Sequence, residues 1–480
     1  MKPAQYPTAP AHLWEHFYQF TQIPRPSKEE EAIRAYVIDQ AELGGHSWQM
    51  DSQGNIVVRV AGTHGMEETG TVIIQNHLDM VTVKTQDKTH DFHTQGLTLK
   101  VEDGWLMADR TTLGADNGLG CAAALALMTD ESVAHPPLEL LFTVDEETGL
   151  GGALNLDGSM LTGNRMLNLD TEDWNELFIG CAGGGGWQFS RSFDQHPVSA
   201  DTRVWQLSLK GLAGGHSGIQ IHEQLGNAIK LVVQFLQGMP GARLVGFDAG
   251  VAHNVIPREA TLTFASEDLD HAALVDRLET LKAQWLSFLP PADGGLEAQF
   301  NEVQATDALS TVDTQALLNL IALFPHGAQA YNLEQPADLV DLSINLAIAR
   351  LAEGELFVES SFRFFNYEQS LPLQQAVEGL ARTFELTVVP DAGYPGWQPE
   401  FDSPLLAQGK AIHERLFGIV PEVKAIHAGL ECGILKSKKP DADILSFGPT
   451  IRGAHSPTER VQIDTVPPFW QYLTALLADM

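Results

Sequence analysis

Histidines and carboxylates stand where several apolar runs of the sequence end. Residues 71–76 read as a buried strand, and His77 and Asp79 follow directly. Because side chains alternate between the two faces of a strand, residues two apart can face one pocket. A neutral imidazole is a good metal ligand, and a carboxylate beside it can orient the ring. A single His-x-Asp motif is weak evidence, so the other strand ends decide its meaning.

Acidic residues follow two further apolar runs. One run leads directly into Asp145, Glu146 and Glu147, and another ends in Asp170. Three consecutive acids that face a cleft repel one another, so they need a cation or a proton between them. The pattern indicates a cation site at the carboxyl ends of the strands, where ligands collect in open α/β sheets.

Asp116 opens an Ala- and Leu-rich segment that reads as a helix. Gly118 and Gly120 could indicate phosphate binding at the start of that helix. Their spacing is not that of a P-loop, however, and Asp116 would repel a phosphate. Asp116 is therefore either a helix cap or a metal ligand.

Five side chains are candidate metal ligands: His77, Asp116, Glu147, Asp170 and His455. Mixed imidazole and carboxylate ligands suit zinc, cobalt or manganese. Five ligands exceed a simple tetrahedral zinc site, but they suit two divalent ions that share one bridging carboxylate. Three carboxylates leave such a pair about one positive charge, which a hydroxide would neutralise. A metal pair of this kind activates water for hydrolysis.

The elements around these residues predict an α/β fold with a second domain. The chain has 480 residues, which exceeds one ordinary core. After Gly183–Gly186 the strands alternate like half-exposed antiparallel strands, and a helix–strand–helix pattern resumes near residue 403. We predict a catalytic domain from residues 1–186 and 393–480, and an inserted α+β domain from residues 187–392.

Composition excludes several classes of function. The net charge of −33 argues against binding to nucleic acid and to anionic membrane surfaces. No apolar run approaches the roughly 20 residues of a membrane span, and residues 1–7 do not resemble a signal peptide. Three widely spaced cysteines suit a reducing compartment better than a disulfide framework. We therefore expect a cytoplasmic protein.

The ordered motifs resemble those of the co-catalytic zinc exopeptidases, a family of aminoacylases, tripeptidases, glutamate carboxypeptidases and dipeptidases. The resemblance spans nearly the whole chain. Its motifs are His77-Leu-Asp79, Gly114-Ala-Asp116-Asn117, Asp145-Glu146-Glu147-Thr-Gly149, Asn168-Leu-Asp170 and His455-Ser-Pro-Thr-Glu459. Three further stretches look like the cytosolic aminoacyl-histidine dipeptidase branch, the carnosinase-like enzymes: 20–27, 211–218 and 427–433.

The resemblance implies a zinc-exopeptidase-like α/β catalytic domain with a mixed central sheet. It implies that His77 and Asp170 bind one metal and that Glu147 and His455 bind the other. Asp116 would bridge them, with a cis peptide bond to the next residue. Zn²⁺ is the favoured ion, with Co²⁺ or Mn²⁺ as alternatives.

The resemblance also assigns the catalytic groups. Glu146 would be the general base that activates a metal-bridging water, and Asp79 would orient His77.

The inserted domain would act as a lid and would form a homodimer. The resemblance implies that His216, Asn254, Arg363 and Gly429 hold the substrate. Other interpretations stay open: His216 could belong to a structural turn, Arg363 could be an exposed strand residue, and Gly429 could simply mark a turn.

The expected activity is hydrolysis of unblocked dipeptides, Xaa-His and others, including β-alanyl-histidine. The alternative is a deacylase or carboxypeptidase of the same fold that acts on N-acyl amino acids. A non-catalytic binding protein is a third possibility, but such a relative should lack metal ligands, and none is missing here.

Overall fold

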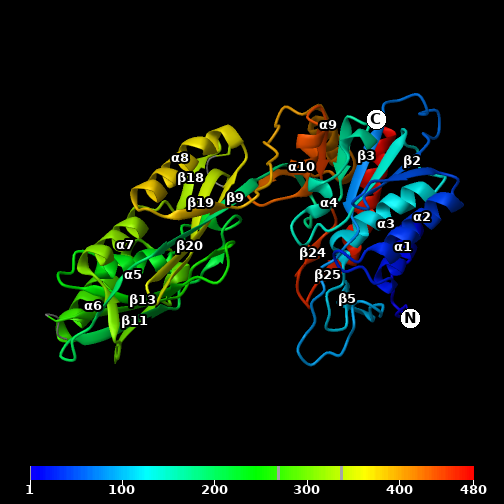
Figure 1. Ribbon diagram of the computed structural model, residues 1–480. Coiled ribbons are helices and arrows are strands. Elements are labelled where there is room, and N and C mark those ends of the chain that lie inside the picture. The colour runs from blue at the N-terminus through cyan, green and yellow to red at the C-terminus, as the bar shows by residue number, and fades with distance from the viewer. Residues whose placement is uncertain (1, 268–270, 336–338) are drawn as a thin grey trace. The chain divides into compact units, whose positions relative to one another are not determined.

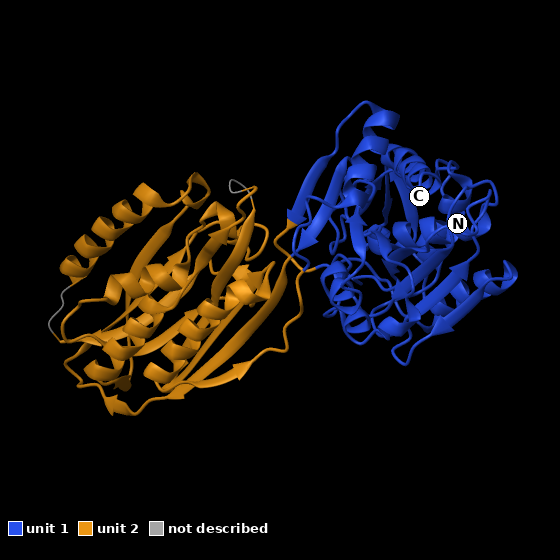
Figure 2. Ribbon diagram, turned by 90° about the horizontal axis from the view of Figure 1, so that it is seen from above, with its two compact units in different colours: residues 1–181, 397–425, 430–480 blue, residues 182–396, 426–429 orange. Residues whose placement is uncertain are grey.

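A computed structural model describes residues 2–267, 271–335 and 339–480 of the chain. The chain divides into two compact units (Figure 2). Unit 1 comprises Met1–Cys181, Trp397–Ala425 and Leu430–Met480, and unit 2 comprises Ala182–Gly396 and Ile426–Gly429. Figure 1 labels many of the helices and strands of both units.

Unit 1 is built on an eight-stranded mixed sheet in the order β1-β2-β6-β3-β7-β23-β8-β22. The strands are β1 (Ser47–Met50), β2 (Ile56–Val60), β3 (Val72–His77), β6 (Leu138–Thr143), β7 (Arg165–Asn168), β8 (Glu176–Cys181), β22 (Glu422–Ile426) and β23 (Asp443–Ser446). Strand β3 runs parallel to both β6 and β7, and β23 runs parallel to β7. The pairs β1–β2, β2–β6 and β8–β23 are antiparallel, so the predicted mixed α/β fold is confirmed.

The centre of this sheet is buried along its whole length. Every residue of β3 and β6 is buried, as continuous apolar runs predict for strands covered on both faces. The helices of unit 1 are α1 (Ala11–Gln22), α2 (Glu31–Leu43), α3 (Ala115–Thr129), α4 (Gly151–Leu154), α9 (Pro404–Phe417), α10 (Glu431–Lys438) and α11 (Val466–Ala478). Helix α3 is buried on all sides, which explains its Ala- and Leu-rich composition.

Unit 1 contains a second, small sheet. Residues 84–113 show no strand pattern in the sequence, yet they contain β4 (Leu99–Glu102) and β5 (Trp105–Ala108), which pair with each other. Strand β5 also pairs with β25 (Arg460–Gln462), which pairs with β24 (Ile451–Arg452). Four-residue strands carry too little periodicity for their pairing to be predicted from local sequence.

Unit 2 contains a nine-stranded sheet in the order β16-β11-β15-β13-β19-β20-β9-β21, with β18 beside β19. Its strands are β9 (Gly183–Ser192), β11 (Arg203–Lys210), β13 (Arg243–Ala249), β15 (Ala260–Ser266), β16 (Glu297–Val303), β18 (Gly327–Tyr331), β19 (Val340–Ala352), β20 (Glu355–Phe364) and β21 (Thr387–Pro390). Two short pairs complete the unit: β10 (Gln195–Pro197) with β17 (Asp307–Leu309), and β12 (Gly215–His216) with β14 (Val255–Ile256).

Four helices cover one face of this antiparallel sheet (Figure 1). They are α5 (Ala228–Leu236), α6 (His271–Phe288), α7 (Thr311–Leu323) and α8 (Tyr367–Thr383). Phe235, Trp285 and Leu317 are among the helical side chains in the core beneath them.

The glycine run 183–186 is the first part of strand β9. A Cβ atom on Gly183 would lie 2.4 Å from the backbone nitrogen of Gly396, and one on Gly184 would lie 2.9 Å from the ring of Tyr394. These glycines therefore let a second segment pack directly on the strand. The division between the units falls just before them, between Cys181 and Ala182.

Candidate metal centre and substrate-binding residues

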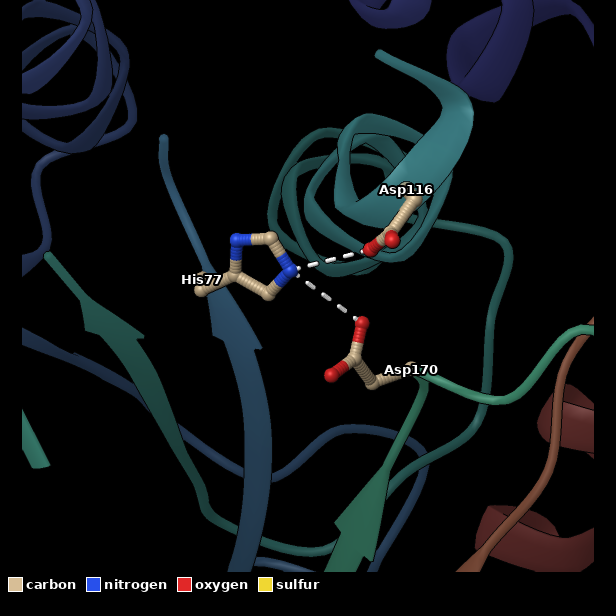
Figure 3. Close-up of side chains that lie close together, drawn as sticks. All are labelled: His77, Asp116 and Asp170. Carbon is tan, nitrogen blue, oxygen red and sulfur yellow. Dashed lines mark hydrogen bonds and ion pairs between the residues drawn. The ribbon is translucent and has the colours of Figure 1, made fainter. Parts of the chain in front are cut away.

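His77 is the last residue of β3 and is almost fully buried. Its Nε2 atom lies 3.0 Å from Oδ1 of Asp116 and 3.4 Å from Oδ1 of Asp170. Figure 3 shows the imidazole facing both carboxylates. Asp116 belongs to the first turn of α3, and Asp170 lies just beyond β7. Because β3 and β7 are parallel neighbours, their carboxyl ends meet at the same edge of the sheet.

His455 approaches the same group from the loop after β24. Its Nε2 atom lies 3.3 Å from Oδ2 of Asp116 and 3.0 Å from Oε2 of Glu147. The two oxygens of Asp116 thus face two different histidines. The structure brings all five candidate ligands together as two groups that share Asp116, and in each group the ligand atoms lie within 4.8 Å of one another.

Asp79 contacts His77 at Nδ1, the ring nitrogen that does not face Asp116 and Asp170. Its Oδ1 atom lies 3.3 Å from Nδ1 of His77, and its two oxygens accept hydrogen bonds from the backbone N–H groups of Glu146 and Glu147. Ser27 donates a further hydrogen bond of 2.7 Å to Oδ2. Burial favours the neutral acid, but His77, Ser27 and the backbone donor of Glu146 outweigh it and lower the pKa of Asp79 to about 2.

Ser27 and Glu30 have the spacing of a capping box, but they do not cap helix α2. Helix α2 begins at Glu31, and no side chain caps its amino end. The hydroxyl of Ser27 bonds Asp79 instead, and the carboxylate of Glu30 accepts from the backbone N–H of Asp145. The side chains of both residues therefore bond the segments that carry the candidate metal ligands.

The electrostatics of the cluster fit bound cations. Glu147 Oε1 is buried and has no hydrogen-bond partner among the described residues. Hydrogen bonds to Asp116 and Glu147 raise the pKa of His455 to about 11. Burial would lower the pKa of His77, but Asp170, Asp116 and Asp79 raise it well above its ordinary value. The negative charge of these carboxylates therefore favours positive charge at both imidazoles. Divalent ions can supply that positive charge in place of protons.

Glu146 lies beside the cluster, in a group with His77 and Glu147. Burial, together with Asp170, Glu431 and Glu147, raises the pKa of Glu146 well above its ordinary value, although His77 opposes the shift. A carboxylate of this kind can accept a proton more readily than an exposed one. The Asp116–Asn117 peptide bond is cis, as the resemblance implies.

Two buried residues position the segments around the candidate metal ligands, although the sequence alone assigned neither of them a role. The guanidinium of Arg25 donates to the carbonyls of Leu78, Asp79 and Gly114, at 2.8, 2.7 and 2.5 Å. It thus joins the strand end that carries His77 to the turn before α3. The only feature of the sequence that could have pointed to this residue is its position between two prolines.

Glu459 is the second such residue. Its carboxylate is buried and accepts hydrogen bonds from four consecutive backbone N–H groups, at residues 113–116. Glu459 therefore holds the turn that carries Asp116. It stands in the motif that contains His455, which was the one available signal.

The four predicted substrate-binding residues all lie in unit 2. His216 ends the short strand β12, and its Nδ1 accepts hydrogen bonds from the backbone N–H groups of Gly218 and Ile219, each at 3.1 Å. The proton of the neutral ring is therefore on Nε2, which can donate. Burial and the charge of Arg363 lower the pKa of His216 to about 4, so the ring is neutral near pH 7.

Asn254 lies close to His216. Its carbonyl accepts a hydrogen bond from the backbone N–H of Ser217, and both His216 and Asn254 line a cavity of about 360 Å³. Arg363 lies in β20 and is only 9% exposed, so it is not an exposed strand residue. Gly429 lies in the segment Ile426–Gly429 of unit 2, where a Cβ atom would meet the ring of Tyr394 at 2.8 Å.

Among the described residues, no helix is both long and apolar enough to cross a membrane.

Comparison with known proteins identifies the family to which the chain belongs. Residues 73–479 match the model of peptidase family M20/M25/M40. The cytosol non-specific dipeptidase of Escherichia coli (strain K12) is 36% identical over 479 residues, which cover 98% of each protein. The crystal structure of aminoacylhistidine dipeptidase from Vibrio alginolyticus superposes with a TM-score of 0.91 at 34% identity, over 98% of this chain and 97% of that one.

A more distant structure shares the fold. A tripeptidase from Staphylococcus aureus gives a TM-score of 0.55 at 14% identity, over 98% of this chain and 97% of that chain. The resemblance drawn from the motifs is confirmed by the family model and by the two more similar relatives. The chain belongs to peptidase family M20/M25/M40.

Proposed function

We propose that this chain is a metal-dependent dipeptidase that hydrolyses unblocked dipeptides, Xaa-His and others, including β-alanyl-histidine. The observation that carries the proposal is the pair of ligand groups that share Asp116, with Glu146 beside them. Two full-length relatives more than 30% identical to this chain are named as dipeptidases, which supports the same substrate class.

Two divalent ions, with Zn²⁺ favoured, fit the two groups. His77 and Asp170 would hold one ion, Glu147 and His455 the other, and Asp116 would contribute one oxygen to each. Such ions lower the pKa of a bound water and polarise a carbonyl group. Asp79 keeps the His77 ring oriented through its contact with Nδ1.

The remaining steps belong to protein side chains. Glu146 accepts the proton of the attacking water and delivers it to the departing amine. The Nε2–H group of His216 donates to the oxygen that becomes negative in the tetrahedral intermediate. Arg363 binds the carboxylate at the end of the dipeptide, because a guanidinium can form two parallel hydrogen bonds with it. Asn254 and Gly429 complete the substrate-binding set.

We also propose the arrangement of the whole protein. Unit 1 would be the catalytic domain, and unit 2 would be the lid and dimerisation domain of a homodimer. A cytoplasmic location is supported by the name of the Escherichia coli relative, a cytosol dipeptidase.

Hydrolysis of a peptide panel by metal-free and metal-reloaded protein tests the proposal. The panel contains β-alanyl-histidine, alanyl-alanine, a tripeptide and an N-acetyl dipeptide. We expect cleavage of the two unblocked dipeptides, with activity that returns as two metal ions bind per chain. Full activity of the metal-free protein would overturn the proposal. Preference for the N-acetyl substrate would instead identify a deacylase or carboxypeptidase.

A further inference from the structure

Arg363 is a buried cation that lacks a counter-ion. Its side chain lies in β20, and its Nε has no hydrogen-bond partner among the described residues. No described Asp or Glu forms an ion pair with it. A cation this far from solvent is costly unless an anion pairs with it, and this chain has a net charge of −33, so acids are plentiful elsewhere. The position therefore indicates a site for an external anion.

Tyr394 is the only described side chain that hydrogen-bonds this guanidinium. Nη1 of Arg363 donates to the phenol oxygen of Tyr394 at 3.1 Å. Because that oxygen acts as the acceptor, its own proton points away from the guanidinium and is free to donate. Both groups line a cavity of about 190 Å³, together with His253 and Ser361.

The position of Tyr394 is tightly determined. Its backbone exchanges two hydrogen bonds with Gly184, at 3.0 and 2.8 Å. Its ring occupies the space that side chains at residues 184 and 429 would fill, since a Cβ at either glycine would lie 2.8–2.9 Å from ring atoms. Two glycines that are distant in sequence therefore make room for one phenol, which is held against Arg363.

The neighbouring histidines add no further positive charge beside Arg363. Burial and Arg363 lower the pKa of His427 to about 3, and they lower that of His216 to about 4. Both rings are neutral near pH 7, and an imidazole carries no negative charge, so neither ring is a counter-ion for Arg363. The cavity does contain a carboxylate, Asp391, but it forms no ion pair with Arg363.

We propose that Tyr394 is a substrate-binding residue whose phenol O–H donates to the terminal carboxylate of the dipeptide beside Arg363. This inference rests on the proposed dipeptidase function and adds a residue to it. The site for the terminal carboxylate would then contain two donors, the charged guanidinium of Arg363 and the neutral phenol of Tyr394. The pair would favour a free carboxylate over an uncharged amide at the end of the substrate.

The variant Tyr394→Phe tests the proposal, because it removes only one hydroxyl. We compare β-alanyl-histidine with its C-terminal amide, and use the amide as a competitive inhibitor if its turnover is too slow. We expect KM for the free acid to rise about 10- to 100-fold, the cost of one hydrogen bond to a charged group. The value of kcat should change less than about threefold, and KM or Ki for the amide should rise clearly less than KM for the acid, because a neutral acceptor forms a weaker hydrogen bond.

Tyr367→Phe is the matched control, because Tyr367 is an exposed tyrosine of unit 2 that does not line this cavity. It should leave both constants unchanged. Equal losses for acid and amide in Tyr394→Phe would overturn the proposal, since they would mean a structural role only. No change for either would also overturn it. If the wild-type chain cleaves no unblocked dipeptide, the proposed function itself fails before Tyr394 is tested.

Discussion

Glu146 and Glu147 are adjacent in the chain but have different surroundings. Their backbone N–H groups bond the two oxygens of Asp79, so one carboxylate anchors both. Glu147 then reaches His455 at 3.0 Å, whereas no ion pair with a histidine is formed by Glu146 among the described residues. We therefore propose Glu147 as the metal ligand and Glu146 as the group that moves a proton.

Glu146→Gln should therefore retain metal and lose hydrolysis. We expect kcat to fall by about 10²–10⁴-fold or more, because the amide cannot accept a proton. Glu147→Gln should instead lower the metal content towards one ion per chain. Elemental analysis and steady-state kinetics distinguish the two, with the exposed Glu131→Gln as control. Loss of metal in Glu146→Gln, with full metal in Glu147→Gln, would reverse the roles.

A half-buried histidine outside the candidate metal centre makes stability depend on pH. His326 accepts a hydrogen bond from the backbone N–H of Leu346 at 3.3 Å, and burial and nearby Lys230 lower its pKa to about 3. The unfolded chain binds a proton at this residue below about pH 6.5, whereas the folded chain does not until about pH 3. The free energy of unfolding therefore falls as the pH falls between these values.

His326→Gln should remove this contribution. Between pH 6.5 and pH 5 the wild type should lose about 2 kcal/mol more than the variant, from 1.36 kcal/mol per pH unit. Urea unfolding at the two pH values measures the difference. The exposed His12→Gln serves as control, and an equal loss in wild type and His326→Gln would contradict the assignment.

At the scale of elements, helix α3 begins without a cap from its own segment. Its N-cap residue is Gly114, which has no side chain to offer. The carboxylate of Glu459 takes over that role from the far end of the chain, and its four hydrogen bonds are 2.7–3.3 Å long. One side chain therefore sets both the start of α3 and the position of Asp116.

Glu459→Gln should destabilise the fold and disturb the metal site together. The amide keeps one acceptor oxygen and turns an NH₂ group towards the backbone donors, so we expect a loss of about 2–4 kcal/mol. Urea unfolding and metal titration measure the two effects. Glu102→Gln, at an exposed strand position, is the control. Unfolding energies that match in the two variants would show that Glu459 does not hold this turn.

At the scale of the whole molecule, the proposed homodimer leads to a prediction about which chain supplies His216 to a working site. Mixing Glu146→Gln with His216→Ala chains tests this, because each variant alone should be nearly inactive. If His216 acts in the partner's site, a mixed dimer regains about one working site. Labelled subunits show whether exchange has occurred. Exchange without any recovery of activity would assign His216 to the site of its own chain or to no site.

The sequence by itself determined the chemistry of the metal centre and the type of fold. Short apolar runs bounded by turn residues fit buried strands, and parallel strands bring their carboxyl ends to one edge, which is where His77 and Asp170 meet. The local pattern of residues and the geometry of sheets are enough to predict the fold class and the five candidate ligands. That prediction needs no knowledge of contacts between distant segments.

Only the tertiary structure decided which side chains support those groups. Ser27 bonds Asp79 rather than capping its helix, Glu459 caps a helix whose Ala115 lies 344 residues earlier in the chain, and Tyr394 fills the space above two glycines. A polar side chain bonds whichever partner burial brings near, and its local motif states only what it could bond. Such partners depend on how distant segments pack, which no local pattern of residues records.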